Sequence, residues 1–256
     1  MEHQATVIAL TGKGGVGKTS LSAAAVRLLA ERFPAARILA IDADPAVGLA
    51  TALGVTVRET LDDIRKRVAA DVTGKLRDTQ DILAEARFRL FEAMEERQSF
   101  AFLAIGRPEA AGCYCAVNAY LRQVISLLAQ DFDYVVIDGE AGIEQINRRV
   151  MDRVTHLLFV SDQSKKGLQV IETIRQVADG LMMYEKGGLI LNRVTRPDLL
   201  PTGQIAGMAL LAAVGPDDRQ AENDMEGRSV FSLPPDSPVL LGAEAALSKL
   251  GILKSR

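Results

Sequence analysis

An eight-residue stretch at positions 12–19, Gly-Lys-Gly-Gly-Val-Gly-Lys-Thr, constrains the fold of this chain more than any other feature. It matches the pattern G-x-x-x-x-G-K-[ST], in which the N–H groups of a glycine-rich loop surround nucleotide phosphates. The apolar run 7–10 precedes it and an alanine- and leucine-rich segment, 21–30, follows it. This order predicts a strand, a loop and a helix, which is the context that the motif needs. A glycine-rich turn without a ligand is the alternative, and both flanking segments argue against it.

Each position of the loop has an expected role. The glycines allow the backbone N–H groups to turn inward, and the N-terminus of the helix adds a partial positive charge. Lys18 is expected to reach the β- and γ-phosphates, and the Thr19 hydroxyl is expected to bind Mg²⁺. The residues predicted to bind nucleotide here are Gly12, Lys13, Gly14, Gly15, Val16, Gly17, Lys18, Thr19 and Ser20.

Composition narrows the class of protein. Of the 256 residues 48% are apolar, which is enough for a large core, and the formal net charge of −3 argues against a general nucleic-acid binder. The polar start at 1–4 does not resemble a signal peptide, and no apolar run approaches the roughly 20 residues of a membrane helix. We therefore expect a soluble, cytoplasmic protein that binds neither membrane nor nucleic acid.

Strand-like and helix-like segments alternate along the chain. This alternation predicts one doubly wound α/β domain over residues 1–256, a P-loop NTPase with a mostly parallel central sheet flanked by helices. A charged segment at about 58–98 breaks the alternation and predicts a helical insertion. The predicted strands are 6–10, 37–41, 101–105, 134–137, 157–160, 189–191 and 210–214, and the predicted helices are 20–32, 117–129, 165–178, 218–225 and 239–250.

Acidic residues follow two of the predicted strands. Asp42 and Asp44 end the strand 37–41, and Asp138 ends the strand 134–137. The carboxyl ends of parallel strands form the ligand-binding edge of such a sheet. An aspartate there can orient the attacking water or bind Mg²⁺ through water, although aspartate also suits a turn after a strand. From the residues alone, either role is open to Asp42, Asp44 and Asp138.

The second lysine of the loop, Lys13, makes the motif similar to the deviant Walker A family, which includes the Min and Par positioning ATPases and the nitrogenase iron protein. The resemblance implies a homodimer with ATP at its interface, in which Lys13 contacts the nucleotide of the partner subunit. It also implies that Asp44, rather than Asp42, activates water and that Asp138 binds Mg²⁺ through water. Asn192 and Arg193 resemble the family's adenine-binding position, and Pro234 and Asp236 lie in a proline-rich turn, 233–236, similar to one that closes over the base.

The two cysteines, Cys113 and Cys115, are separated by one residue. A disulfide at this spacing would be strained, so a reducing compartment and a metal role are favoured. Two thiolates cannot complete a four-coordinate shell, whereas two chains related by a two-fold axis supply four sulfurs. Such a site suits tetrahedral Zn²⁺ or square-planar Ni²⁺. Two buried structural thiols are the simpler alternative.

Several motifs together resemble the carbon monoxide dehydrogenase maturation ATPases of the CooC type. They are the deviant phosphate loop, Asp-Ala-Asp-Pro at 42–45, Gly-Arg-Pro-Glu at 106–109 before Cys-x-Cys, and Glu-Ala-Gly-Ile-Glu at 140–144. The resemblance implies ATP hydrolysis to ADP, a homodimer promoted by ATP and metal, and nickel insertion into carbon monoxide dehydrogenase or acetyl-CoA synthase. Gly139 departs from the family, where a threonine is expected.

Two alternatives remain within the broader family. An iron-protein-type redox ATPase would need a second, well-separated cysteine after residue 139, and the stretch 139–144 has none. The other alternative is a Min- or Par-type positioning ATPase. One of the Min type would need a membrane-binding tail, and the mildly amphipathic segment 247–254 is interrupted by Gly251. The positioning function also gives no reason for Cys-x-Cys.

Overall fold

The fold is seen in a computed structural model, which describes residues 5–72, 88–106, 123, 125–139, 150, 153–181, 183–200 and 205–254. Within these ranges the side chains of residue 65 and of 68–72 are not described. Cys113 and Cys115 lie outside the described residues, as do 140–144 and most of the predicted helix 117–129.

The described part of the chain forms an eight-stranded sheet in the order β3-β4-β2-β5-β1-β6-β7-β8. Every pairing is parallel except that of β3 with β4. The predicted α/β fold with a mostly parallel sheet is therefore confirmed. The strands are β1 (Thr6–Gly12), β2 (Ile38–Asp42), β3 (Glu95–Glu96), β4 (Ala101–Ala104), β5 (Tyr134–Asp138), β6 (Val154–Ser161), β7 (Tyr184–Leu191) and β8 (Leu210–Ala213).

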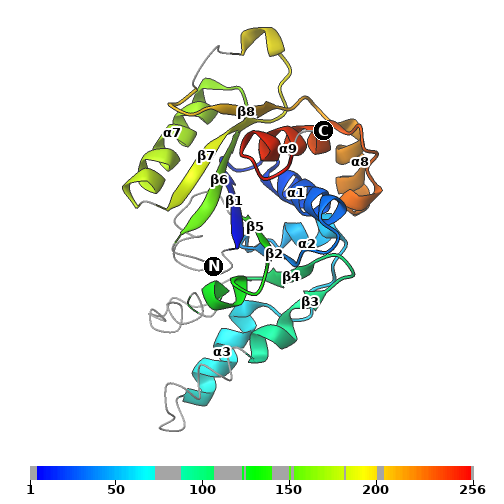
Figure 1. The fold of residues 1–256 in the computed structure, drawn as a ribbon. Helices are drawn as coiled ribbons and strands as arrows, with labels where there is room; N and C mark the ends of the chain where they lie inside the picture. The colour runs from blue at the N-terminus through cyan, green and yellow to red at the C-terminus, as the bar shows by residue number, and fades with distance from the viewer. Residues whose placement is uncertain are drawn as a thin grey trace.

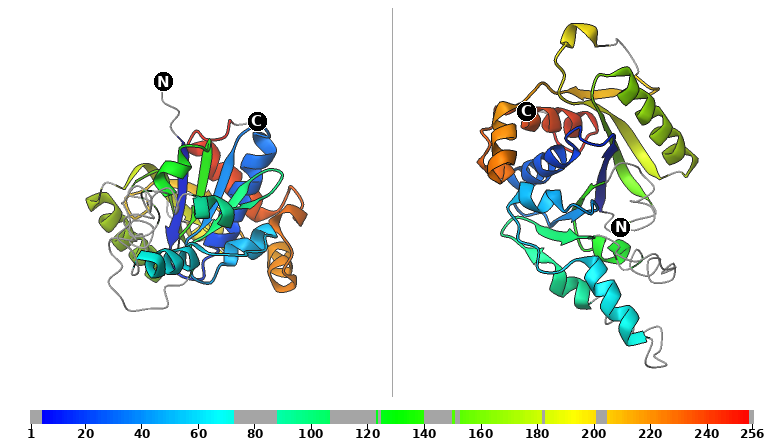
Figure 2. Two further views of the ribbon diagram at one scale, coloured as in Figure 1. Left: turned by 90° about the horizontal axis from the view of Figure 1, so that it is seen from below. Right: turned by 180° about the vertical axis from the view of Figure 1, so that it is seen from behind.

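Helices cover both faces of this sheet. Figures 1 and 2 show α7 on one face and α1, α8 and α9 on the other, while α3 extends beyond the β4 side. None of the described helices is long and apolar enough to cross a membrane. The helices are α1 (Lys18–Arg32), α2 (Gly48–Leu53), α3 (Leu61–Val72), α7 (Lys165–Gly180), α8 (Asp218–Glu226) and α9 (Pro238–Lys249), with 3-10 turns η1 (Pro197–Leu199) and η2 (Val230–Ser232).

The side chains of the strands divide between two apolar layers because successive residues of a strand point to opposite faces. In β1, Val7 and Ala9 join the layer beneath α7, whereas Ile8 and Leu10 join the layer beneath α1 and α9. Helix α1 is buried along almost its whole length between the sheet and α9, which explains its alanine- and leucine-rich sequence. The loop at 12–17 thus connects a buried central strand to a buried helix.

The segment 58–98 was predicted to be a helical insertion, and its end differs from that prediction. Helix α3 and a helical stretch at 88–93 agree with it. Glu95 and Glu96, in contrast, form β3, which pairs antiparallel with Phe102 and Ala101 of β4. The helical prediction is wrong there, because the edge of β4 offers backbone hydrogen bonds that outweigh the helical preference of glutamate.

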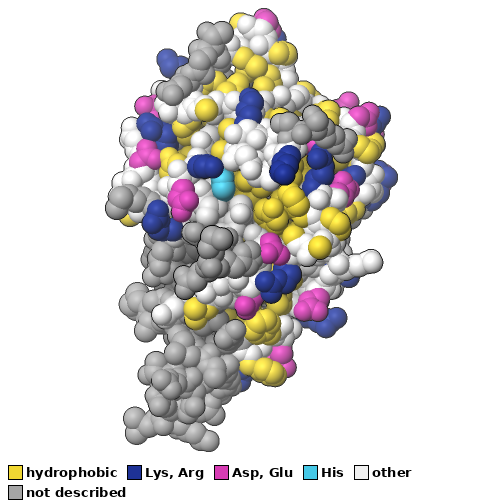
Figure 3. Space-filling view, viewed as in Figure 1, with side chains coloured by type: hydrophobic (Ala, Val, Ile, Leu, Met, Phe, Trp, Pro, Cys, Tyr) yellow, Lys and Arg dark blue, Asp and Glu magenta, His cyan; other side chains and the backbone are white. Residues whose placement is uncertain are grey.

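The surface carries charges of both signs. On the face shown in Figure 3, Lys and Arg side chains lie beside Asp and Glu side chains, with apolar side chains between them. This mixture accords with the small net charge of −3.

Candidate nucleotide site

The loop between β1 and α1 needs glycine at several positions. Gly12, Gly15 and Gly17 have φ angles of 146°, 75° and 90°, which side chains with a Cβ rarely adopt. A Cβ on Gly12 would lie only 2.0 Å from the carbonyl oxygen of Val160 in the neighbouring strand β6. The sequence pattern of glycines thus reflects backbone conformation and close packing against the sheet.

The N-terminus of α1 is open to an anion. Its N-cap, Gly17, has no side chain to accept a hydrogen bond from the first turn. The N–H groups at the start of this helix are therefore available to phosphate oxygens. The Lys18 ammonium lies over the loop, 3.4 Å from the carbonyl oxygen of Gly12 and 3.2 Å from that of Lys13. This arrangement places a positive charge where the loop would hold phosphates.

Strand register brings the acidic residues to this loop. Asp42 of β2 pairs with Asp138 of β5, and Asp138 in turn pairs with Leu10 of β1. Both aspartates are the last residues of their strands and are almost wholly buried. The carboxylate predicted to bind Mg²⁺ therefore lies between the phosphate loop and the turn that carries Asp44.

Asp138 has one carboxylate oxygen engaged and one unpaired. Oδ1 accepts a hydrogen bond from the Ser22 hydroxyl at 3.0 Å, and the buried Oδ2 has no hydrogen-bond partner among the described residues. Burial raises the pKa of Asp138 to about 6, and the nearby Thr19 and Ser22 hydroxyls and the Lys18 ammonium act against that rise. An unpaired carboxylate oxygen beside Thr19 fits a hydrated Mg²⁺ bound with a nucleotide, and such an ion would favour the ionised form.

Asp42 and Asp44 have different surroundings. The two oxygens of buried Asp42 accept hydrogen bonds from the N–H groups of Asp44, at 3.1 Å, and Leu49, at 2.8 Å. Burial, and then the charge of Asp138, raises the pKa of Asp42 to about 7. Asp44 is only partly buried, and its Oδ1 accepts from the N–H of Ala46. Asp42 thus holds the turn, which leaves Asp44 the more accessible of the two carboxylates.

Lys13 forms an ion pair within its own chain. Its Nζ lies 2.7 Å from Oδ2 of Asp162, which follows β6, and each side chain is 32% exposed. Burial would raise the pKa of Asp162, but hydrogen bonds from Lys13 and Ser164 hold it below its usual value. Asp162 was not among the predicted site residues, although it directly follows a strand, the same signal that pointed to Asp42 and Asp138.

A cavity of about 300 Å³ lies beside the loop, toward β7 and α8. The Asn192 amide at its wall donates a 2.8 Å hydrogen bond to the carbonyl oxygen of Val16, so this predicted base-binding residue contacts the phosphate loop. Residues at 215–218, Gly-Pro-Asp-Asp, were missed as lining residues, although Gly-Pro marks a turn. The lining residues are Gly17, Ser20, Asn192, Arg193, Gly215, Pro216, Asp217, Asp218, Gln220, Ala221, Asp224 and Val239.

Pro234 and Asp236 do not line this cavity. Asp236 forms an exposed ion pair with Arg219 at 3.0 Å, and the carbonyl oxygen of Pro234 accepts from the N–H of Ser237. Closure of this turn over a bound base stays a prediction. The proposed metal ligands Cys113 and Cys115 lie outside the described residues, so the shared metal site stays a prediction as well.

A glycine-rich loop before an uncapped helix, with carboxylates at the ends of adjacent parallel strands, defines a P-loop nucleotide-binding protein. The family model of the CobQ/CobB/MinD/ParA nucleotide-binding domain matches residues 7–230, and the chain belongs to this family.

Two relatives and one solved structure show what the chain is similar to. An uncharacterised ATP-binding protein of Methanocaldococcus jannaschii is 34% identical over 95% of this chain and 98% of its own length. The carbon monoxide dehydrogenase accessory protein CooC of Rhodospirillum rubrum is 31% identical over 75% of this chain and 81% of its own length. Among solved structures, the septum site-determining protein MinD of Pyrococcus horikoshii in complex with Mg-ADP superposes with a TM-score of 0.71 at 23% identity, covering 96% of both chains.

Proposed function

We propose that this chain is an ATP-hydrolysing metallochaperone that acts as a nucleotide-dependent homodimer in nickel insertion into carbon monoxide dehydrogenase or acetyl-CoA synthase. The observation that carries the proposal is Cys-x-Cys at 113–115 in a chain that has the deviant phosphate loop and is similar to CooC. Nickel is the cargo in this account, and Zn²⁺ is the alternative occupant of the same four thiolates.

The hydrolytic step uses the carboxylates at the strand ends. Asp44 accepts a proton from a water molecule as the water oxygen bonds to the γ-phosphorus, and the bond from that phosphorus to the bridging oxygen breaks. Lys18 and the N–H groups of the loop stabilise the negative charge that moves to the leaving ADP. Asp138 and Thr19 would hold Mg²⁺, which supplies further charge neutralisation when it is bound.

Replacement of one carboxylate tests hydrolysis. Asp44→Asn should bind ATP with unchanged affinity and release phosphate at least about 100-fold more slowly, because general-base catalysis contributes that much or more. The exposed Glu222→Gln on α8 makes the same change in charge and should behave as the parent protein does. Unaltered phosphate release by Asp44→Asn would remove Asp44 from the mechanism.

The dimer has its own test. Lys13 has a partner, Asp162, within its own chain, so ATP-driven pairing of two subunits requires Lys13 to leave that partner. Lys13→Ala should bind ATP as a monomer but form few ATP-dependent dimers in sedimentation velocity. Dimers that form as readily as those of the parent protein would contradict a role for Lys13 across the interface.

Metal stoichiometry tests the metallochaperone role. Anaerobically purified protein should bind one Ni²⁺ or Zn²⁺ per two chains, with affinity that falls at acid pH because thiolates must lose protons. Ni²⁺ should give thiolate charge-transfer absorption, and Zn²⁺ should give none. Double replacement of Cys113 and Cys115 by alanine should abolish metal binding and client activation but not ATP binding. One metal per chain, or metal retained by that variant, would contradict the shared site.

A positioning ATPase is the second candidate, favoured by the close superposition with MinD. The two functions differ in what ATP promotes. A MinD-type protein should float with anionic liposomes when ATP is present, whereas a metallochaperone should not. Flotation with ATP together with absent metal binding would replace the first proposal by the second.

A further inference from the structure

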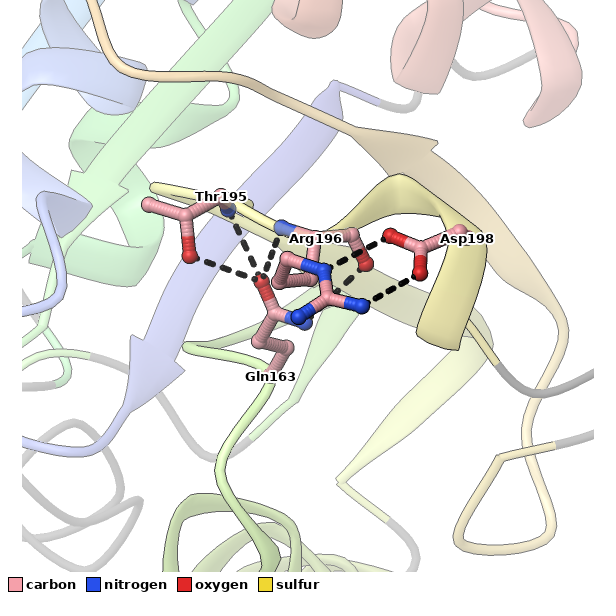
Figure 4. Close-up of polar contacts among 4 residues, drawn as sticks. All are labelled: Gln163, Thr195, Arg196 and Asp198. Atoms are coloured by element: carbon pink, nitrogen blue, oxygen red, sulfur yellow. Dashed lines mark hydrogen bonds and ion pairs between the residues drawn. The ribbon is translucent and has the colours of Figure 1, made fainter.

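The side-chain amide of Gln163 clasps a loop that is distant in sequence. Its Oε1 accepts hydrogen bonds from two successive backbone N–H groups, those of Thr195 at 2.8 Å and Arg196 at 3.0 Å (Figure 4). Its Nε2 donates to the carbonyl oxygen of Arg196 at 3.2 Å. A paired Arg196–Asp198 contact stiffens the same loop. One side-chain amide therefore forms hydrogen bonds with two N–H groups and one carbonyl oxygen of the loop after β7.

This loop begins with the base-binding turn, which is conformationally strained. Arg193 has a φ angle of 57°, unusual for a residue with a side chain, and such strain persists only where surrounding contacts enforce it. The turn is held before Arg193 by the Asn192 N–H, which donates to the carbonyl oxygen of Ser161 at 2.8 Å. It is held after Arg193 by the Val194 N–H, which donates to the carbonyl oxygen of Val214 at 2.8 Å, and then by the hydrogen bonds of Gln163 to Thr195 and Arg196. Gln163 is thus one of the contacts that hold the cavity wall at Asn192 and Arg193.

The residue before Gln163 is Asp162, the partner of Lys13. A closed circuit of contacts therefore starts and ends in the phosphate loop. It runs from Lys13 to Asp162 and along the chain to Gln163. From there it crosses to the loop after β7 and returns through the Asn192 amide to Val16. The circuit thus gives a continuous path of bonds between the ion pair and the cavity wall.

We propose that Gln163 is a positioning residue that holds the base-binding turn and couples its occupation to the Lys13–Asp162 pair. This inference rests on the proposed binding of ATP. An adenine base held at Asn192 stabilises the clasped turn, and the segment 161–163 that carries Asp162 is stabilised with it. Coupling of this kind is reciprocal, so a change at Asp162 alters the affinity for the base.

Glutamine suits this position chemically because it accepts and donates at once. Gln163→Met preserves length and apolar volume but removes all the clasping hydrogen bonds. Gln163→Glu keeps an oxygen that accepts from both N–H groups and loses only the donor. Because the loop after β7 is exposed, water can replace the lost hydrogen bonds, so the variants should keep the fold. Unfolding in urea checks this.

The experiment compares ATP with inorganic tripolyphosphate, which occupies the phosphate loop but carries no base. Gln163→Met should weaken ATP binding by about fivefold or more, the lower end of typical coupling, and leave tripolyphosphate affinity unchanged. Gln163→Glu should stay within about twofold of the parent protein, since it keeps the main acceptor. Gln169→Met, on an exposed position of α7, is the matched control and should have no effect.

A double-mutant cycle tests the coupling. Asp162→Asn and Gln163→Met together should weaken ATP binding by less than the product of the single effects, since both interrupt one circuit. Additive effects, equal loss of ATP and tripolyphosphate affinity, or no loss in Gln163→Met would each overturn the inference. Failure of the parent protein to bind ATP would instead overturn the proposed function, and this inference with it.

Discussion

Asp42 should make the nucleotide-free protein less stable as the pH rises from about 4 to about 7. Burial, and then the charge of Asp138, raises the pKa of Asp42 from 3.8 to about 7 in the folded chain. Between these values the folded state keeps a proton that the unfolded chain has lost. The stability due to this proton is complete below about pH 4 and is lost as the pH rises through about 7. At about 1.4 kcal/mol per pH unit, the whole effect is about 4 kcal/mol.

Urea unfolding at pH 5 and pH 8, without nucleotide or Mg²⁺, measures the part of this effect between those values. Asp42 should lower the free energy of unfolding by about 3 kcal/mol over this interval. Asp42→Asn should lack that contribution and keep the smaller one from Asp138, whose pKa is raised to about 6. At pH 5 the variant should be about as stable as the parent protein. The lost backbone hydrogen bond costs about 1 kcal/mol, but by pH 5 the parent has already lost about 1–2 kcal/mol through the raised pKa of Asp42, which asparagine does not lose.

The exposed variant Glu222→Gln removes one charge without touching the site and should keep the pH dependence of the parent protein. The reasoning fails if Asp42→Asn and the parent protein lose the same stability between pH 5 and pH 8. It also fails if the stability of the parent protein rises over this interval.

Three further changes probe the loop and its contacts. Asp162→Asn should alter the free energy of unfolding by no more than about 1 kcal/mol, because the ion pair is partly exposed. It should also release Lys13 and raise the dimer fraction at saturating ATP, and a smaller dimer fraction in sedimentation would contradict this. Gly12→Ala should cost more than about 3 kcal/mol in urea unfolding, since its Cβ would meet the Val160 carbonyl group, and a smaller cost would show that the loop can shift. Asn192→Ala should cost about 1–2 kcal/mol through the lost buried hydrogen bond, and a stability equal to that of the parent protein would show that the bond contributes nothing.

Much of the fold could be predicted because its signals are local. Apolar runs that form strands buried on both faces, and a helix rich in alanine and leucine, are visible in windows of about ten residues. The short elements were missed or misread. Helix α2 has six residues, and the strand at Glu95–Glu96 exists only because β4 offers it a partner edge. Neither leaves a periodic pattern long enough to detect.

In the candidate site, too, the residues in local motifs were predicted and those brought together from distant segments were partly missed. The phosphate loop and the acid at the end of β5 were identified because each lies in a contiguous motif. The choice of Asp44 over Asp42 rested on a resemblance, and the structure adds a physical reason, since both oxygens of Asp42 are already bonded to backbone N–H groups. The cavity beside the phosphate loop was only half predicted, because its second wall comes from a different part of the chain, 215–224.

The sequence by itself determined the local structures whose backbone conformation depends on neighbouring residues. The glycine loop and the helix that follows it are examples. Tertiary structure alone decided which distant groups meet. Lys13 and Asp162 are 149 positions apart, and Asn192 and Val16 are 176 apart. These pairs arise because parallel strand order places the ends of β1, β6 and β7 side by side. That order is set by the burial of two apolar layers over the whole sheet, to which every strand contributes, and not by any local pattern of residues.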